Sequence, residues 1–115
     1  MVEALIQEME FRKSEFNLPL KSVYFGGGTP SQLSNSELSH LMNYIHSNLG
    51  IAPNAEVTLE ANPDDLTREK LLQLKEKGIN RLSIGIQSFF EEDLRFMNRA
   101  HSANEALECI ALATE

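Results

Sequence analysis

The sequence predicts an α/β fold in which parallel strands alternate with helices. Segments suited to a strand and segments suited to a helix alternate three times along the chain, and a further helix precedes the first strand. Alternation of this kind is typical of parallel strands joined by crossover helices. No long linker or block of charge divides the 115 residues, so one structural unit is expected.

The first helix is predicted over the first sixteen residues, where apolar side chains from Val2 to Phe16 recur at helical spacing. Pro19 ends it, because proline disfavours helical geometry in the residue before it. The apolar stripe starts at Met1 with no capping residue ahead of it, so we expect the natural domain to have sequence upstream. Ser22–Phe25 is the first predicted strand, and it leads into a glycine loop.

The second helix is predicted to begin at a capping box formed by Ser34 and Glu37 and to end at Gly50. Glu56–Ala61 is the second predicted strand, and Thr67 is the expected cap of a third helix. This third helix extends through Lys77, and its expected buried residues are Leu71, Leu72 and Leu74.

The third strand is predicted over Arg81–Ile86, where apolar residues alternate with small or polar ones. A short helix follows near Glu91–Met97. Another begins at about Asn104, since Ser102 and Glu105 have the spacing of a second capping box.

The composition excludes several classes of protein. With 42% hydrophobic and 23% charged residues, the chain is neither disordered nor collagenous, and no apolar run approaches the roughly 20 residues that span a bilayer. Ten basic against 17 acidic residues give a net charge of −7, which lacks the basic footprint of a nucleic-acid binder. A single cysteine, Cys109, excludes a disulfide framework. We therefore expect a cytoplasmic protein without a membrane span.

Polar side chains on one face of the predicted strands are the first functional signal. Buried parallel strands are normally apolar throughout, yet Thr58 and Glu60 alternate with Val57 and Leu59 in the second strand. In the third strand the polar or small residues end at Gln87. Because ligand sites form at the carboxyl ends of parallel strands, Glu60 and Gln87 are expected to meet there beside the glycine loop. The alternatives are a polar face open to water and a Glu60 that only pairs with a cation.

The glycine loop Gly26-Gly27-Gly28-Thr29-Pro30 follows the first strand directly. It lacks the Lys-Ser/Thr of a phosphate-binding P-loop and the spacing of a dinucleotide fingerprint. Successive glycines nevertheless let the backbone approach a ligand closely. A plain tight turn is the alternative.

Three ordered motifs carry a family resemblance that covers nearly the whole chain. VYFGGGTP, TLEANPDDLT and GINRLSIGIQSFFEEDLRFMNRAH resemble the oxygen-independent coproporphyrinogen III oxidase family of radical S-adenosylmethionine (SAM) proteins. Within it, EANP, IQSF and the ending Arg99-Ala100-His101 are more similar to the HemW-like branch, described as haem chaperones, than to the true decarboxylating oxidase.

The resemblance implies a partial (βα)6 TIM-like barrel, of which residues 1–115 would be part of the radical SAM core domain. The family's cluster motif, CxxxCxxC, and its last barrel strands are absent here, so we expect an internal fragment that carries the second to fourth strands. A 4Fe–4S cluster needs three thiolates, and Cys109 is only one. The cluster is therefore expected only in the full-length parent, and the fragment is expected to be inactive.

The resemblance also assigns SAM contacts, and the chemistry of each residue suits its assignment. A carboxylate such as Glu60 can accept hydrogen bonds from the ammonium group of SAM, and Gln87 can bind ribose hydroxyls. The fork of Arg99 can bind the carboxylate of SAM through two hydrogen bonds. The implied cofactor-binding residues are Gly27, Gly28, Thr29, Glu60, Gln87 and Arg99.

The remaining chemically active side chains are expected to be structural or exposed. His101 is expected to be a solvated loop histidine rather than a haem ligand. His40 and His46 fall on the exposed side of the second helix, and Cys109 lies among apolar residues as a small core residue.

The sequence leaves three functions open for the whole protein. The first is a HemW-like protein that binds SAM and handles haem. The second is a true coproporphyrinogen III decarboxylase of porphyrin biosynthesis, and the third is a non-radical βα barrel that binds phosphosugars. A fragment of a barrel would also have unpaired strand edges, so a dimer or larger assembly is expected.

Overall fold

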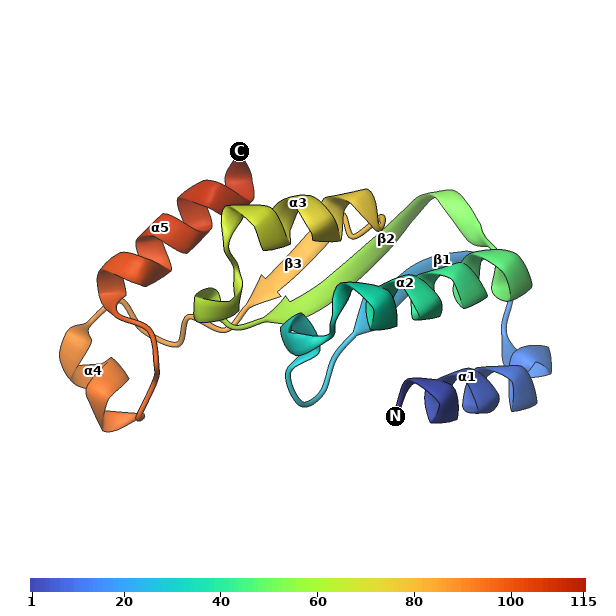
Figure 1. Ribbon diagram of the computed structural model, residues 1–115, viewed down its shortest axis with the longest axis horizontal. Helices are drawn as coiled ribbons and strands as arrows, with labels where there is room; N and C mark the ends of the chain where they lie inside the picture. Colours follow the sequence, from blue (N-terminus) through green and yellow to red (C-terminus); the bar gives the residue numbers. More distant parts are fainter.

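The computed structural model describes residues 1–115 and confirms the predicted α/β fold (Figure 1). Three parallel strands form one sheet in the order β1-β2-β3. The strands are β1 (Leu20–Phe25), β2 (Ile51–Ala61) and β3 (Arg81–Ile84). The helices are α1 (Val2–Phe11), α2 (Asn35–Tyr44), α3 (Arg68–Glu76), α4 (Glu91–Phe96) and α5 (Ala103–Thr114). The molecule is elongated, with extents of 48 × 27 × 23 Å.

The core lies between one face of the sheet and helices α2, α3 and α5. Leu59 on the central strand is fully buried, and Leu38, Leu74 and Cys109 reach the same cluster from the three helices. In strand β2 the side chains of Val57, Leu59 and Ala61 are all buried in this core, as the alternation of the strand predicts.

Local sequence signals correctly place the starts of α2, α3 and α5. The hydroxyl of Ser34 accepts a hydrogen bond from the backbone amide of Glu37, and the carboxylate of Glu37 accepts one from the backbone amide of Ser34. The first capping box is therefore confirmed. Ser102 and Glu105 form the second in the same way, and Thr67 caps α3. Between Tyr44 and Gly50 the second helix continues as a π-helical turn, Ile45–Leu49, and it ends at Gly50 with φ 74°.

Several predicted boundaries are wrong by a few residues. The first helix ends at Phe11 and is followed by a 3-10 turn, Lys13–Glu15. Strand β2 begins at Ile51, because the amide of Leu20 donates to the carbonyl of Gly50 and pairs the strands earlier than their hydrophobic pattern suggests. Strand β3 ends at Ile84.

One of the three leucines expected to be buried on α3 is not. Leu74 is buried and Leu71 is half-buried, whereas Leu72 is 56% exposed. Consecutive helical residues differ by about 100° around the axis, so a helix that presents Leu71 and Leu74 to the sheet turns Leu72 away from it.

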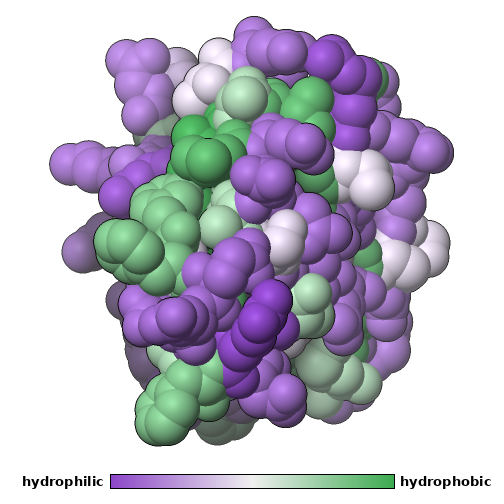
Figure 2. Space-filling view, turned by 90° about the vertical axis from the view of Figure 1, so that its left-hand side faces the viewer, coloured by the Kyte–Doolittle hydropathy of each residue, from purple (hydrophilic) through white to green (hydrophobic).

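Apolar surface remains exposed beside strand β3 and around α4. A groove of about 840 Å³ lies between α3, β3 and α5, and nine of its sixteen lining residues are hydrophobic. Figure 2 views the end of the molecule that carries α4 and α5, where apolar and polar groups are interspersed. The exposed large side chains near α4 are Phe89, Phe90, Phe96 and Met97. None of the helices combines the length and the apolarity needed to cross a bilayer.

Candidate functional site

The carboxyl ends of the three strands meet at one edge of the sheet and surround a pocket. Phe25 of β1 is aligned with Leu59 of β2, and Ala61 of β2 is aligned with Ile84 of β3, so the three following loops lie side by side. The pocket between them has a volume of about 280 Å³. It is lined by Gly28, Thr29, Pro30, Glu60, Ala61, Asn62, Ser83, Ile84, Gly85 and Gln87.

Four of the six predicted site residues therefore line this pocket directly: Gly28, Thr29, Glu60 and Gln87. A fifth, Gly27, is joined to it because its amide donates a hydrogen bond of 3.0 Å to Oε2 of Glu60. The predicted meeting of the glycine loop with Glu60 and Gln87 at the carboxyl edge is thus observed.

The glycine loop is shaped by backbone conformations that other residues rarely adopt. Gly27 and Gly28 have φ values of 82° and 60°, and a Cβ atom added to either would meet nothing within 4 Å. Space is therefore open in front of both backbones, and the positive φ angles are what require glycine. At Gly26 an added Cβ would lie 2.6 Å from the ring of Tyr24.

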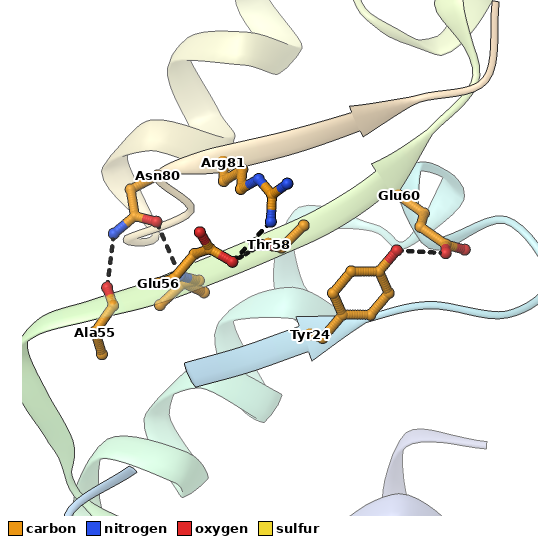
Figure 3. A network of polar contacts seen from close by, with 8 residues as sticks. Tyr24, Ala55, Glu56, Thr58, Glu60, Asn80 and Arg81 are labelled. Carbon is orange, nitrogen blue, oxygen red and sulfur yellow. Dashed lines mark hydrogen bonds and ion pairs between the residues drawn. The ribbon is translucent and has the colours of Figure 1, made fainter. Parts of the chain in front are cut away.

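The carboxylate of Glu60 is held by two donors, one from the first strand and one from its loop, and Figure 3 shows the first of them, Tyr24. The hydroxyl of Tyr24 donates to Oε1 at 2.7 Å, and the amide of Gly27 donates to Oε2. The hydrogen bond from Tyr24, followed by that from Gly27, holds the pKa of Glu60 below its ordinary value of 4.5. The same contact raises the pKa of Tyr24. Glu60 is therefore a pre-oriented anion, and its partner Tyr24 was not predicted from the sequence.

Tyr24→Phe is expected to raise the pKa of Glu60 toward 4.5, because the substitution removes the hydrogen bond that contributes most to the lowering of this pKa. A pH titration of the side-chain carboxyl carbon by NMR measures the shift. A carboxyl whose pKa is lowered by folding stabilises the fold above pH 4.5, and this stabilisation is lost as the pH falls through the folded pKa. Between pH 4.5 and the folded pKa of Glu60, the wild type should therefore lose more stability than the Tyr24→Phe variant.

Tyr44→Phe is the matched control for this titration. The hydroxyl of Tyr44 contacts the carboxylate of Glu10, which raises the pKa of Tyr44 to about 12, and it does not contact Glu60. The pKa of Glu60 should be the same in this variant as in the wild type. An equal shift in both tyrosine variants would contradict the assignment.

Arg99, the sixth predicted residue, stands outside the pocket lining. Its Nη2 donates to the carbonyl oxygen of Gly85 at 2.9 Å and to Oδ1 of Asn62 at 3.3 Å, and both of these residues line the pocket. Arg99 thus ties the loops after β2 and β3 together. Its Nε is buried and has no hydrogen-bond partner.

The expectation that His101 is a solvated loop histidine is wrong. Its side chain is buried, with 3% exposure, and its Nε2 lies 2.9 Å from the carbonyl oxygen of Ile86. The connection between α4 and α5 folds back onto the loop after β3, which no local pattern around residue 101 indicates. His40 and His46 are exposed as predicted.

Cys109 is a buried core residue, as predicted, and burial raises the pKa of its thiol, with a further contribution from Asp64. No group of three or more His, Cys, Asp or Glu side chains is arranged to hold a metal ion. The polar groups at the sheet edge are hydrogen-bond acceptors and donors of the kind that an organic ligand needs.

A second polar network lies toward the amino-terminal part of the same strands (Figure 3). The side-chain oxygen of Asn80 accepts a hydrogen bond of 2.8 Å from the amide of Val57, and its side-chain nitrogen donates one of 2.9 Å to the carbonyl of Ala55. Arg81, the next residue, forms an ion pair with Glu56. Asn80 therefore joins the start of β3 to β2. No pattern in the sequence indicated this network.

The fold and the site define a class of protein that comparison with known families confirms. Residues 2–115 match the model of the radical SAM superfamily, and the chain belongs to that superfamily. Within it the chain is HemW-like: it is 39% identical to the haem chaperone HemW of Escherichia coli over 83% of the chain, and 40% identical to that of Bacillus subtilis over 99%. The chain spans 25% and 31% of the length of these two relatives.

Two solved structures are similar to the chain in fold. Coproporphyrinogen III oxidase HemN from Escherichia coli, described as a radical SAM enzyme, superposes with a TM-score of 0.87 and 31% identity over 98% of the chain and 26% of its own. A truncated Elp3 from Methanocaldococcus infernus, with a TM-score of 0.61 and 18% identity, shares the fold. The three strands and their helices thus correspond to part of the TIM-like barrel of HemN.

Proposed function

We propose that residues 1–115 are part of a radical SAM core domain and form one wall of its SAM site. The observation that carries this proposal is the convergence of the glycine loop, Glu60 and Gln87 on one pocket at the carboxyl edge of the sheet. Superfamily membership favours SAM over a phosphosugar as the ligand, because SAM is the cofactor that the superfamily implies.

The residues present fit the groups that SAM offers. Each oxygen of Glu60 accepts one hydrogen bond from the protein, so each keeps capacity for a further donor such as an ammonium group. The open space in front of Gly27 and Gly28 lets a ligand approach their backbone. The amide of Gln87 provides both donors and an acceptor for hydroxyl groups.

These side chains bind and orient; they do not carry out the one-electron chemistry that SAM and a 4Fe–4S cluster supply when both are bound. Glu60 would hold the ammonium group and Gln87 the ribose, while Arg99, which lies outside the pocket lining, would act on SAM by holding Asn62 and Gly85 in place. Thr29 lines the pocket next to Gly28. A titration of SAM, followed by the amide signals of Gly27 and Gly28, tests the proposal: signals that do not move would reject it.

The cluster itself should not form on these residues alone. Anaerobic incubation of the 115-residue chain with iron and sulfide is expected to leave the protein colourless, because Cys109 is a single buried thiol whose pKa is raised. Absorption spectroscopy and iron analysis measure the outcome. A brown protein with one cluster per chain would contradict the expectation.

We infer that the whole protein handles haem in the manner that the name of its HemW relatives describes, in the cytoplasm. Identities of 39% and 40% with HemW proteins, against 31% with HemN, support this function. The TM-score of 0.87 with HemN keeps porphyrinogen decarboxylation as the second candidate. Incubating the whole protein with haem, or with SAM and coproporphyrinogen III, separates the two: a shifted haem absorption band without vinyl products supports the first.

The unpaired edges of the sheet support self-association of the isolated chain. Strands β1 and β3 each have one side without a partner strand, and the groove of about 840 Å³ lies beside β3. Light scattering of the 115 residues is therefore expected to give a dimer or larger species. A monomer at high concentration would show that these edges are protected.

A further inference from the structure

Two side chains from the connection between α4 and α5 hold successive carbonyl groups of the loop after β3. Nη2 of Arg99 donates to the carbonyl of Gly85 at 2.9 Å, and Nε2 of His101 lies 2.9 Å from the carbonyl oxygen of Ile86. Gln87, the next residue along, lines the pocket. The loop that presents Gln87 is therefore held from behind by residues more than ten positions further along the chain.

The backbone of Gln87 needs such support because its conformation is strained. Its φ angle is 71°, a left-handed value that residues with a side chain seldom adopt. The amide of Ser88 donates to the carbonyl of Ile86 at 2.9 Å, which closes a three-residue γ-turn around Gln87. Strained backbone of this kind persists only where surrounding structure fixes it, and it is concentrated at ligand sites.

The carbonyl of Ile86 is the point at which the γ-turn and His101 meet. A carbonyl oxygen can only accept, so the hydrogen of the His101 ring lies on Nε2. The ring is buried, with 3% exposure, and Nδ1 has no hydrogen-bond partner. The bond to Ile86 is thus the one polar contact of this side chain, and it offsets the burial of a polar ring.

We propose that His101 is a positioning residue for the ligand site: its Nε2–H fixes the carbonyl of Ile86, and thereby the γ-turn that points Gln87 into the pocket. The inference rests on the proposed SAM function for its ligand, but the hold on the γ-turn is a separate property of the chain. His101 itself makes no contact with the ligand.

A pair of amide substitutions separates this role from a purely structural one. In His101→Gln the amide nitrogen can take the place of Nε2 and donate to Ile86, whereas in His101→Asn the shorter side chain places its nitrogen near Nδ1 and cannot reach. His46→Asn, at an exposed histidine, is the matched control. For each variant of the whole protein we would measure the SAM dissociation constant, the exchange rate of the Ser88 amide and the urea midpoint of unfolding.

The expected result is that His101→Asn weakens SAM binding by about tenfold, the lower end of the loss that follows removal of a group that orients a metal ligand. Exchange of the Ser88 amide should accelerate in the same variant, while His101→Gln and His46→Asn resemble the wild type in both measurements. If His101→Asn and His101→Gln lower the urea midpoint equally and leave the dissociation constant unchanged, His101 is only a core residue and the proposal fails.

The two proposals fail in different ways. If the wild type binds no SAM, the proposed function is wrong, and the exchange rate of the Ser88 amide alone decides whether His101 holds the γ-turn. If the wild type binds SAM but His101→Asn changes neither the exchange rate nor the dissociation constant, the positioning role is wrong and the proposed function stands.

Discussion

Glu60→Gln is expected to weaken SAM binding by roughly tenfold to a hundredfold, because a hydrogen bond to a charged group contributes about 1.5–3 kcal/mol. The substitution keeps the shape of the side chain but removes the negative charge that would face the ammonium group. An amide also has only one acceptor oxygen, so the glutamine cannot accept hydrogen bonds from Tyr24, Gly27 and a ligand as well as the two oxygens of Glu60 can. Among single substitutions in the pocket, this one should affect ligand binding most.

The matched control for this experiment is Glu56→Gln. Glu56 lies four residues before Glu60 on strand β2, so both side chains are on the same face of the sheet, but Glu56 pairs with Arg81 at 2.8 Å away from the pocket. NMR titrations of SAM into both variants give the two dissociation constants. Equal weakening in both, or none in Glu60→Gln, would show that Glu60 does not bind the ligand.

Leu59→Ala is expected to lower the free energy of unfolding by about 3–5 kcal/mol, which is a large part of the roughly 5–15 kcal/mol that stabilises a typical domain. Leu59 has no exposed surface, lies on the central strand and belongs to the core cluster that includes residues of α2, α3 and α5. Removing its side chain leaves a cavity that neighbours from three elements cannot fill at once.

Urea unfolding followed by circular dichroism measures this loss, with Leu72→Ala as the control. Leu72 is the same residue type but is 56% exposed on α3, so its truncation should change the free energy of unfolding by less than about 0.5 kcal/mol. If Leu59→Ala lowers the free energy of unfolding by no more than Leu72→Ala does, Leu59 is not a central residue of the core.

Local chemistry determined much of this protein from the sequence alone. The capping boxes at Ser34 and Ser102 predict where two helices begin, because both partners of each box lie within four residues. The alternation along β2 predicts that Glu60 leaves the core face, because side chains alternate strictly along a strand. The glycine loop and the order of strands and helices then predict which ends of the strands meet.

Only the tertiary structure decided which side chains support the site. Tyr24 reaches Glu60 because β1 and β2 pair in one particular register, and that register depends on the pairing of Leu20 with Ile51 and the irregularity that follows it.

His101 is buried because the α4–α5 connection returns to the loop after β3, a contact between residues 15 positions apart. The same return turns Arg99 toward Gly85, where it ties two loops together. Contacts between distant segments depend on how the helices and strands pack together, and this packing cannot be predicted from the secondary-structure propensities of neighbouring residues. The sequence by itself therefore determined the elements and the edge at which the candidate site forms, whereas the packing of the last two helices decided how the site is held.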